Sequence, residues 1–255
     1  MAMAADVRQQ TGCWVYAVVR GADRPAMDAV GIDDAPLRLL VHGAVAAVVA
    51  DVAVDRPPGR RADLMAYSRV VDDLLAGGVV VPVQFGSLMP DEASVVEDFL
   101  APNEGHFTEL LDQLEGRSQF TVRATYVTDT VLREVVATDP AVAELRARTK
   151  GQPEEAVYGD LVRLGELVAQ EMEAKRDVDA ETVCDAVAPL TVAVNVTAGS
   201  GLEAVVDLTC LVDDDRRADF EDRLEDLAEI LHERIHLSLV GPVAPYDFVE
   251  GAPWG

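Results

Sequence analysis

The chain has 255 residues, which is enough for one large domain or two of ordinary size. Its 46 acidic residues against 21 basic ones give a net charge of −25, which repels nucleic-acid phosphates and anionic lipid headgroups. No apolar run reaches the ~18 residues that a membrane-spanning helix needs, and the first residues lack the features of a signal peptide. We therefore expect a cytoplasmic protein with neither a nucleic-acid nor a membrane partner.

The three cysteines indicate a reducing compartment. Cys13, Cys184 and Cys210 are widely spaced, and no Cys-x-x-Cys pair occurs. Free, mostly buried thiols are the natural interpretation of this pattern. The sequence also lacks a phosphate-binding Walker loop and a Gly-x-Ser-x-Gly elbow. We predict no cofactor and no catalytic residue.

The first half of the chain begins with strand patterns. Residues 13–19, rich in aromatic and β-branched side chains, predict a first strand. Residues 37–41 and 44–54 predict a hairpin that turns at His42 and Gly43.

Helical patterns follow on either side of a central stretch. Residues 63–75 have apolar side chains three or four apart, and Gly77-Gly78 ends this helix. Residues 107–114 predict another helix by the same spacing. We expect both helices to pack around the stretch between them.

That central stretch runs from Val79 to Leu100. Its valines predict a buried strand, and Pro82, which has no N–H to donate, indicates an edge strand or a bulge. Phe85 follows the strand and Gly86 turns the chain. Residues 90–100 then predict a helix, because proline and acidic residues suit its first turn.

The second half begins with an alternating pattern at residues 118–126, which predicts a half-buried strand. Residues 130–148 have helical spacing, with two pieces possible at Pro140. Residues 155–174 predict an amphipathic helix and residues 179–187 a separate short one.

Two glycines inside the longer helix, Gly159 and Gly165, cost about 1 kcal/mol each relative to alanine. Close approach of another backbone would justify them.

The last third predicts a hairpin, a helix and a final strand. Residues 190–197 and 203–212 are the paired strands, and the turn lies at Gly199-Ser200-Gly201. Three aspartates at 213–215 open the helix, and residues 235–240 form the final strand.

These patterns predict an α+β fold of two domains. Residues 1–117 form a small N-terminal α+β domain. Residues 118–240 have the split βαβ order of a ferredoxin-like sandwich, with a helical insert at about 153–188. Residues 241–255 form an extended C-terminal tail.

One motif matches a zinc protease. His232-Glu233-x-x-His236 needs both histidines on one helical face, with the glutamate activating a metal-bound water. The helical spacing ends near Leu231, and the residues from His236 alternate like a strand. Two histidines four apart in a strand lie ~13 Å from each other, too far to share a zinc ion. The sequence disfavours a metalloprotease, which stays open as an alternative.

A second motif, Gly199-x-Gly201-x-x-Ala204, mimics a dinucleotide-binding fingerprint. That mechanism requires a helix after the glycines, whereas residues 205–211 predict a strand. A hairpin turn explains these glycines better. A regulatory module that binds a small ligand on the ferredoxin-like sheet is a further alternative.

Three stretches resemble a known family. Val81-Pro82-Val83-Gln84-Phe85-Gly86 resembles the Pro-Val-Arg-Phe-Gly strand of the gas vesicle protein F/L family, with glutamine in place of the usual arginine. Residues 116–120 resemble its Gly-Arg-x-Glu-Val stretch, with Gln119 in place of the acid. Residues 241–248 resemble its Gly-Pro-Trp-Pro-Pro-Tyr-x-Phe ending, with Val243-Ala244 in place of Trp-Pro.

The resemblance implies a non-enzymatic accessory or minor structural protein of the gas vesicle. Its partners would be the major gas vesicle shell protein and other gas vesicle accessory proteins, and its role would be nucleation and assembly. We expect the partner to bind at the central edge strand and the tail. The candidate residues are Pro82, Gln84, Phe85, Gly86, Gly241, Pro242, Pro245, Tyr246 and Phe248.

Overall fold

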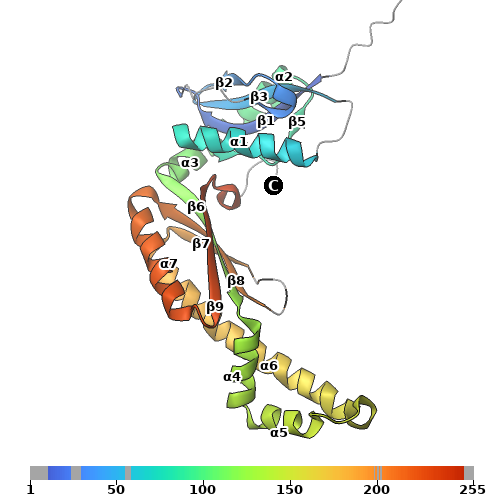
Figure 1. Cartoon of the computed structure of the whole chain (residues 1–255). Helices are drawn as coiled ribbons and strands as arrows, with labels where there is room; N and C mark the ends of the chain where they lie inside the picture. The colour runs from blue at the N-terminus through green and yellow to red at the C-terminus, as the bar shows by residue number, and fades with distance from the viewer. Residues whose placement is uncertain are drawn as a thin grey trace, which may run out of the picture. The chain divides into compact units, whose positions relative to one another are not determined.

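The computed structural model describes residues 11–23, 30–54, 59–197, 199, 201 and 203–249. The chain forms two compact units, one of residues 1–119 with 242–255 and one of residues 120–241. Each unit has an antiparallel sheet and helices (Figure 1). The predicted α+β class is confirmed. Within the described residues, no helix is both long enough and apolar enough to span a bilayer.

The first unit contains a five-stranded sheet. Its strand order is β2-β3-β1-β4, and β5 also pairs with β1. The predicted first strand and the hairpin at Gly43, whose φ is +52°, are both confirmed. The strands are β1 (Thr11–Arg20), β2 (Arg38–His42), β3 (Val45–Ala53), β4 (Val81–Pro82) and β5 (Leu88–Met89).

The central strand β1 is buried almost throughout because helices cover both faces of this sheet. Helix α1 (Arg61–Gly77) packs Tyr67 and Val70 into one core with Trp14 and Tyr16 of β1. Helix α3 (Glu104–Leu114) contacts β1, β3 and β4. The two predicted helices therefore do pack around this part of the chain, as expected.

The stretch from 79 to 100 is less regular than predicted. Its strand is only Val81–Pro82, which lies at the edge of the sheet as Pro82 indicated. Its helix is a short α-helical turn, α2 (Glu92–Ser94), followed by a π-helical turn at Val95–Leu100. Asp91 starts this helix by accepting a 2.8 Å hydrogen bond from the Ser94 N–H. A 3₁₀ turn (Ala101–Asn103) then leads into α3.

The second unit has the predicted split βαβ topology. Its strand order is β7-β8-β6-β9. Strand β8 therefore lies between β6 and β7, the two strands that the helices of residues 128–187 connect along the chain. In the same way, β6 separates β8 from β9. The strands are β6 (Arg117–Tyr126), β7 (Ala193–Thr197), β8 (Ala204–Asp213) and β9 (Ile235–Val243).

Four helices complete this unit. The predicted break at Pro140 is confirmed, and Asp139 caps the helix that follows by accepting a 2.7 Å hydrogen bond from the Ala141 N–H. The prediction of two helices in 155–187 is wrong. One 34-residue helix spans this region, because residues 175–178 contain no proline or glycine to end it. The helices are α4 (Thr128–Thr138), α5 (Pro140–Thr149), α6 (Glu154–Val187) and α7 (Arg217–Leu231).

Close approach of another backbone does not explain the two glycines of α6. A Cβ atom built at Gly159 or Gly165 meets nothing within 4 Å. Both positions face open space in the described structure.

An ion-pair network joins the helices of the second unit to its sheet. The Arg234 guanidinium donates to Asp179 at 2.9 and 3.1 Å and to Glu134 at 2.9 and 3.1 Å. Asp179 is 7% exposed and also accepts a 2.8 Å hydrogen bond from the Tyr126 hydroxyl. Lys175 reaches Glu134 at 3.5 Å. The network fixes α4 and α6 against β6 and the start of β9.

We expect Gly159→Ala and Gly165→Ala each to raise the free energy of unfolding by about 0.5–1 kcal/mol, because alanine restricts the unfolded chain and meets no obstacle here. Urea unfolding followed by circular dichroism measures this. The control is Gly43→Ala, which should destabilise the chain, since its φ is positive and its Cβ would collide with the Glu104 carboxylate. Destabilisation by both α6 substitutions would contradict the open space seen at these sites.

We expect Arg234→Ala to lower the free energy of unfolding by about 2–4 kcal/mol, because it leaves the buried Asp179 carboxylate without its cation. The matched control is Arg123→Ala, which removes an exposed pair with Asp207 and should cost less than about 1 kcal/mol. Equal losses in the two variants would show that the network contributes no more than a surface pair.

Candidate functional site

The two segments predicted to bind a partner meet at one side chain of the first unit, Tyr67 of α1. The Phe85 ring lies edge-on to Tyr67, with the ring centroids 5.4 Å apart. The Tyr246 ring, from the C-terminal segment, lies 6.4 Å from Tyr67. The structure thus brings together residues that are about 160 positions apart in the sequence.

Two aromatic residues of β1 extend this contact into a cluster. Trp14 lies 5.4 Å from Phe85, and Tyr16 stacks on Tyr67 at 6.0 Å. Such ring pairs contribute about 0.5–1.5 kcal/mol each beyond the area they bury. We call the following five residues the aromatic cluster: Trp14, Tyr16, Tyr67, Phe85 and Tyr246.

The hydroxyl groups of the cluster hold its segments in place. The Tyr67 hydroxyl donates to the Val83 carbonyl, which fixes the chain just beyond β4. The Tyr16 hydroxyl accepts a 2.8 Å hydrogen bond from the Ile32 N–H. Burial raises the pKa of Tyr16 and of Tyr246 to about 12 and also raises that of Tyr67. These three tyrosines are therefore uncharged near neutral pH.

The candidate residues divide into those that pack and those that reach the surface. Gln84 and Tyr246 are exposed, as are Gly241 and Pro242 where β9 ends. Phe85, Gly86 and Phe248 are half-buried, and Gly86 turns the chain with a φ of +100°. Pro82 and Pro245 are buried, so a partner could not contact them directly.

The C-terminal segment is part of the first unit, not a separate tail. Strand β9 continues beyond the predicted end at Val240 as far as Val243. Ala244 is fully buried in the core that surrounds the aromatic cluster. The Gln119 amide holds Asp247 twice, donating to its carboxylate at 2.6 Å and accepting from its backbone N–H at 3.0 Å. Residues 250–255 of the predicted tail lie outside the described residues.

Sequence reasoning did not assign Trp14, Tyr16 or Tyr67 to this site. Trp14 and Tyr16 were expected only as strand residues, and Tyr67 only as one residue of a helix face. None of the three lies in a motif, so the only signal in the sequence was their type, in a chain with 5% aromatic residues. Gln119 stands where the family's motif has an acidic residue, and its hydrogen bonds to Asp247 give position 119 a structural role.

The two misleading motifs have the local structure that the sequence suggested. Helix α7 ends at Leu231, and His232 follows it with Nδ1 2.7 Å from the Glu229 carbonyl oxygen. His236 lies in β9, so the two histidines do not share a helical face. The glycines near 199–201 precede strand β8 rather than a helix, and Gly201 has a φ of +98°. Ser200 of that turn lies outside the described residues.

The free thiols also match expectation. Cys13 and Cys210 are buried, Cys184 is half-buried, and all three are free. Burial raises the pKa of Cys13 to about 11 and of Cys210 to about 12, so neither thiol is ionised near neutral pH.

Comparison with known proteins gives a family. The family model described as gas vesicle synthesis protein GvpL/GvpF matches residues 12–250. The chain belongs to the gas vesicle protein F/L family. It is 32% identical over 240 residues to gas vesicle protein F of Streptomyces sp. (strain CB03234), covering 93% of this chain and 99% of that protein. It is 16% identical to gas vesicle protein F of Dolichospermum flosaquae, covering 93% and 97%.

Two solved structures of this family share the fold. The crystal structure of GvpF from Anabaena sp. PCC7120 matches with a TM-score of 0.82 at 16% identity, over 94% of this chain and 98% of that one. The crystal structure of GvpF from Microcystis aeruginosa matches with a TM-score of 0.74 at 16% identity, over 94% and 99%. At this identity the likeness establishes the fold of the chain.

We expect Gln119→Glu to destabilise the chain by about 1–2 kcal/mol at neutral pH, because it places a buried carboxylate against Asp247. The double variant Gln119→Glu with Asp247→Asn should recover much of this loss, since an amide then faces the new acid. Urea unfolding of the three proteins measures the effect. If the double variant were no more stable than the single one, repulsion between the new carboxylate and Asp247 would not be the cause of the loss.

Proposed function

We propose that this chain is a non-enzymatic accessory protein of the gas vesicle that binds the major gas vesicle shell protein and assists nucleation and assembly. The family assignment supports an association with the gas vesicle. A shell subunit with a large apolar face would aggregate before it enters the wall. A partner that covers this face for a time would keep the subunit available for assembly.

The observation that carries the proposal is the aromatic cluster. It joins two of the three segments that resemble the family, and it lies where Gln84 and Tyr246 reach the surface. Tyr246 is 37% exposed, so part of a large aromatic side chain is available to a partner while the rest packs on Tyr67. Aromatic anchors with a packed base are typical of residues that contribute most to binding.

The charge of the chain suits this role. The tyrosines of the cluster are neutral, so an apolar partner meets little desolvated charge there. The net charge of −25 over the whole chain would keep a complex with an apolar subunit in solution. The protein would thus act in the cytoplasm and at the gas vesicle, without binding nucleic acid or lipid.

Nothing in the geometry favours either alternative. A zinc protease needs both histidines of its motif on one helix, whereas His232 follows the end of α7 and His236 lies in β9. In the part of the chain that the structure describes, no observation points to a particular small ligand on the ferredoxin-like sheet.

We expect the full chain to purify as a complex with the major shell protein when both are produced in the same cells. Tyr246→Ala should reduce the co-purified shell protein roughly tenfold, because it removes the exposed ring, and Gln84→Ala should reduce it less. Quantitative mass spectrometry of the purified complex measures the ratio of the two proteins.

The matched control is Tyr158→Ala, which removes a tyrosine that is 65% exposed on α6 of the second unit. It should leave the amount of shell protein unchanged. Tyr246→Phe separates binding from folding, since it keeps the ring against Tyr67 and loses only the hydroxyl. Failure to obtain any complex would overturn the proposal, and full binding by Tyr246→Ala would remove the aromatic cluster from it.

A further inference from the structure

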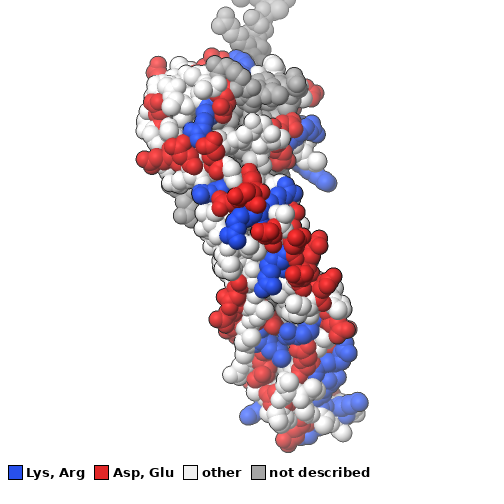
Figure 2. Space-filling view, turned by 90° about the vertical axis from the view of Figure 1, so that its left-hand side faces the viewer, with Lys and Arg blue, Asp and Glu red and all other residues white. Residues whose placement is uncertain are grey.

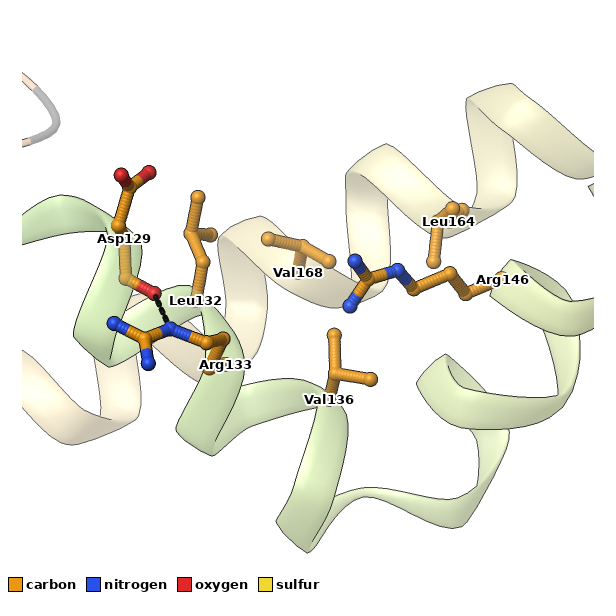
Figure 3. A pocket seen from close by; sticks show the side chains of 7 residues that line it. All are labelled: Asp129, Leu132, Arg133, Val136, Arg146, Leu164 and Val168. Carbon is orange, nitrogen blue, oxygen red and sulfur yellow. Dashed lines mark hydrogen bonds between the residues drawn. The ribbon is translucent and has the colours of Figure 1, made fainter. Parts of the chain in front are cut away.

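A groove in the second unit lies between helices α4, α5 and α6. Its volume is about 500 Å³. Four aliphatic side chains line it, two from α4 and two from α6, and Figure 3 shows them facing a common space. These side chains are Leu132, Val136, Leu164 and Val168. Leu132 is 36% exposed, so the apolar lining is open to solvent.

Two arginines also line the groove, and neither has a carboxylate partner among the described residues. Arg133 donates only to its own helix, through a 2.9 Å hydrogen bond to the Asp129 carbonyl and one of 3.2 Å to the Thr130 hydroxyl. The Arg146 side chain makes no hydrogen bond or ion pair within the described part of the chain, and it is exposed. Figure 3 shows its side chain extending from α5 toward Val168. The third charged residue of the lining, Asp129, lies at one end.

Unpaired guanidinium groups are notable beside an apolar floor in this chain. Acidic residues outnumber basic ones by 46 to 21 over the whole sequence. The α4–α5 segment departs from this, with four basic and four acidic residues between 128 and 150. Figure 2 shows blue atoms interspersed with red ones toward the lower end of the view, where Figure 1 places these helices. The four basic residues are Arg133, Arg146, Arg148 and Lys150.

A neighbouring arginine of the same segment does have a carboxylate partner. Arg148 pairs with Asp160 of α6 at 2.5 Å. Arg146, two residues earlier, is aimed into the groove and has no such acid. A carboxylate of a partner could form with Arg146 the kind of ion pair that Asp160 forms with Arg148.

We propose that this groove binds an amphipathic helix of a partner protein, whose apolar side chains fill the space between α4 and α6 and whose carboxylates pair with Arg133 and Arg146. A helix fits because the groove is bounded by helices alone and offers no sheet edge for a strand to join. Apolar residues three and four apart on such a helix match a groove between two helices. This surface is distinct from the aromatic cluster, and the inference does not depend on the shell-protein proposal.

The test uses the full chain and fluorescent helical peptides of about 18 residues, which is about five turns. One peptide carries leucines at helical spacing flanked by glutamates. A second replaces the glutamates by lysines, and a third has the same composition with the leucine spacing scrambled. Fluorescence anisotropy measures binding. We expect micromolar binding of the first peptide alone, weakened at least roughly tenfold in the double variant Arg133→Glu with Arg146→Glu.

The matched control is the variant Arg163→Glu, which changes an exposed arginine of α6 that does not line the groove. It should bind the first peptide as the wild type does. Absence of binding by the first peptide, or equal loss in Arg163→Glu and the double variant, would overturn the proposal. Binding of oleate with the same dependence on Arg133 and Arg146, and of no peptide, would replace the helix by a small carboxylate amphiphile.

Discussion

The buried hydroxyl of Tyr67 is the constraint on which the first unit depends. It lies on α1, and it donates to the carbonyl of Val83, a residue just beyond an edge strand of only two residues. A strand so short cannot fix the following loop by ladder hydrogen bonds alone. Because a buried hydroxyl without a partner costs about 1–3 kcal/mol, the Tyr67 hydrogen bond holds the loop and the helix together.

The same side chain explains why two remote segments of the sequence share a surface. Tyr16 stacks on the Tyr67 ring and Phe85 lies edge-on to it, while the C-terminal segment places the Tyr246 ring 6.4 Å away. Ala244 is fully buried in the core beneath these rings. Part of the Tyr246 side chain packs against Tyr67, and the rest is exposed to solvent.

The periodic parts of the fold were predictable from the sequence, and the contacts between them were not. Strands β1, β6 and β8 and helices α1, α3 and α7 each have an apolar pattern that one element satisfies locally. Helix α6 was divided in two because its apolar face fades near Lys175, where polar residues instead join the ion-pair network with Glu134. The candidate segments were found through short motifs. Their meeting at Tyr67, and the capture of Asp247 by Gln119 across 128 residues, are long-range pairings that no local pattern encodes.

The two surfaces differ in their physical chemistry, and this difference separates their partners. The aromatic cluster is uncharged near neutral pH, so binding there depends on buried apolar area and shape and changes little with salt. The groove of α4, α5 and α6 combines an apolar floor with two guanidinium groups in a chain of net charge −25. At physiological ionic strength the Debye length is about 8 Å, so the distant acids are largely screened while a carboxylate in contact with Arg146 is not. A groove of this kind selects against a purely apolar face, which would leave its arginines desolvated and unpaired. The two proposed partners, an apolar subunit at the first unit and a charged helix at the second, would therefore not compete for the same surface.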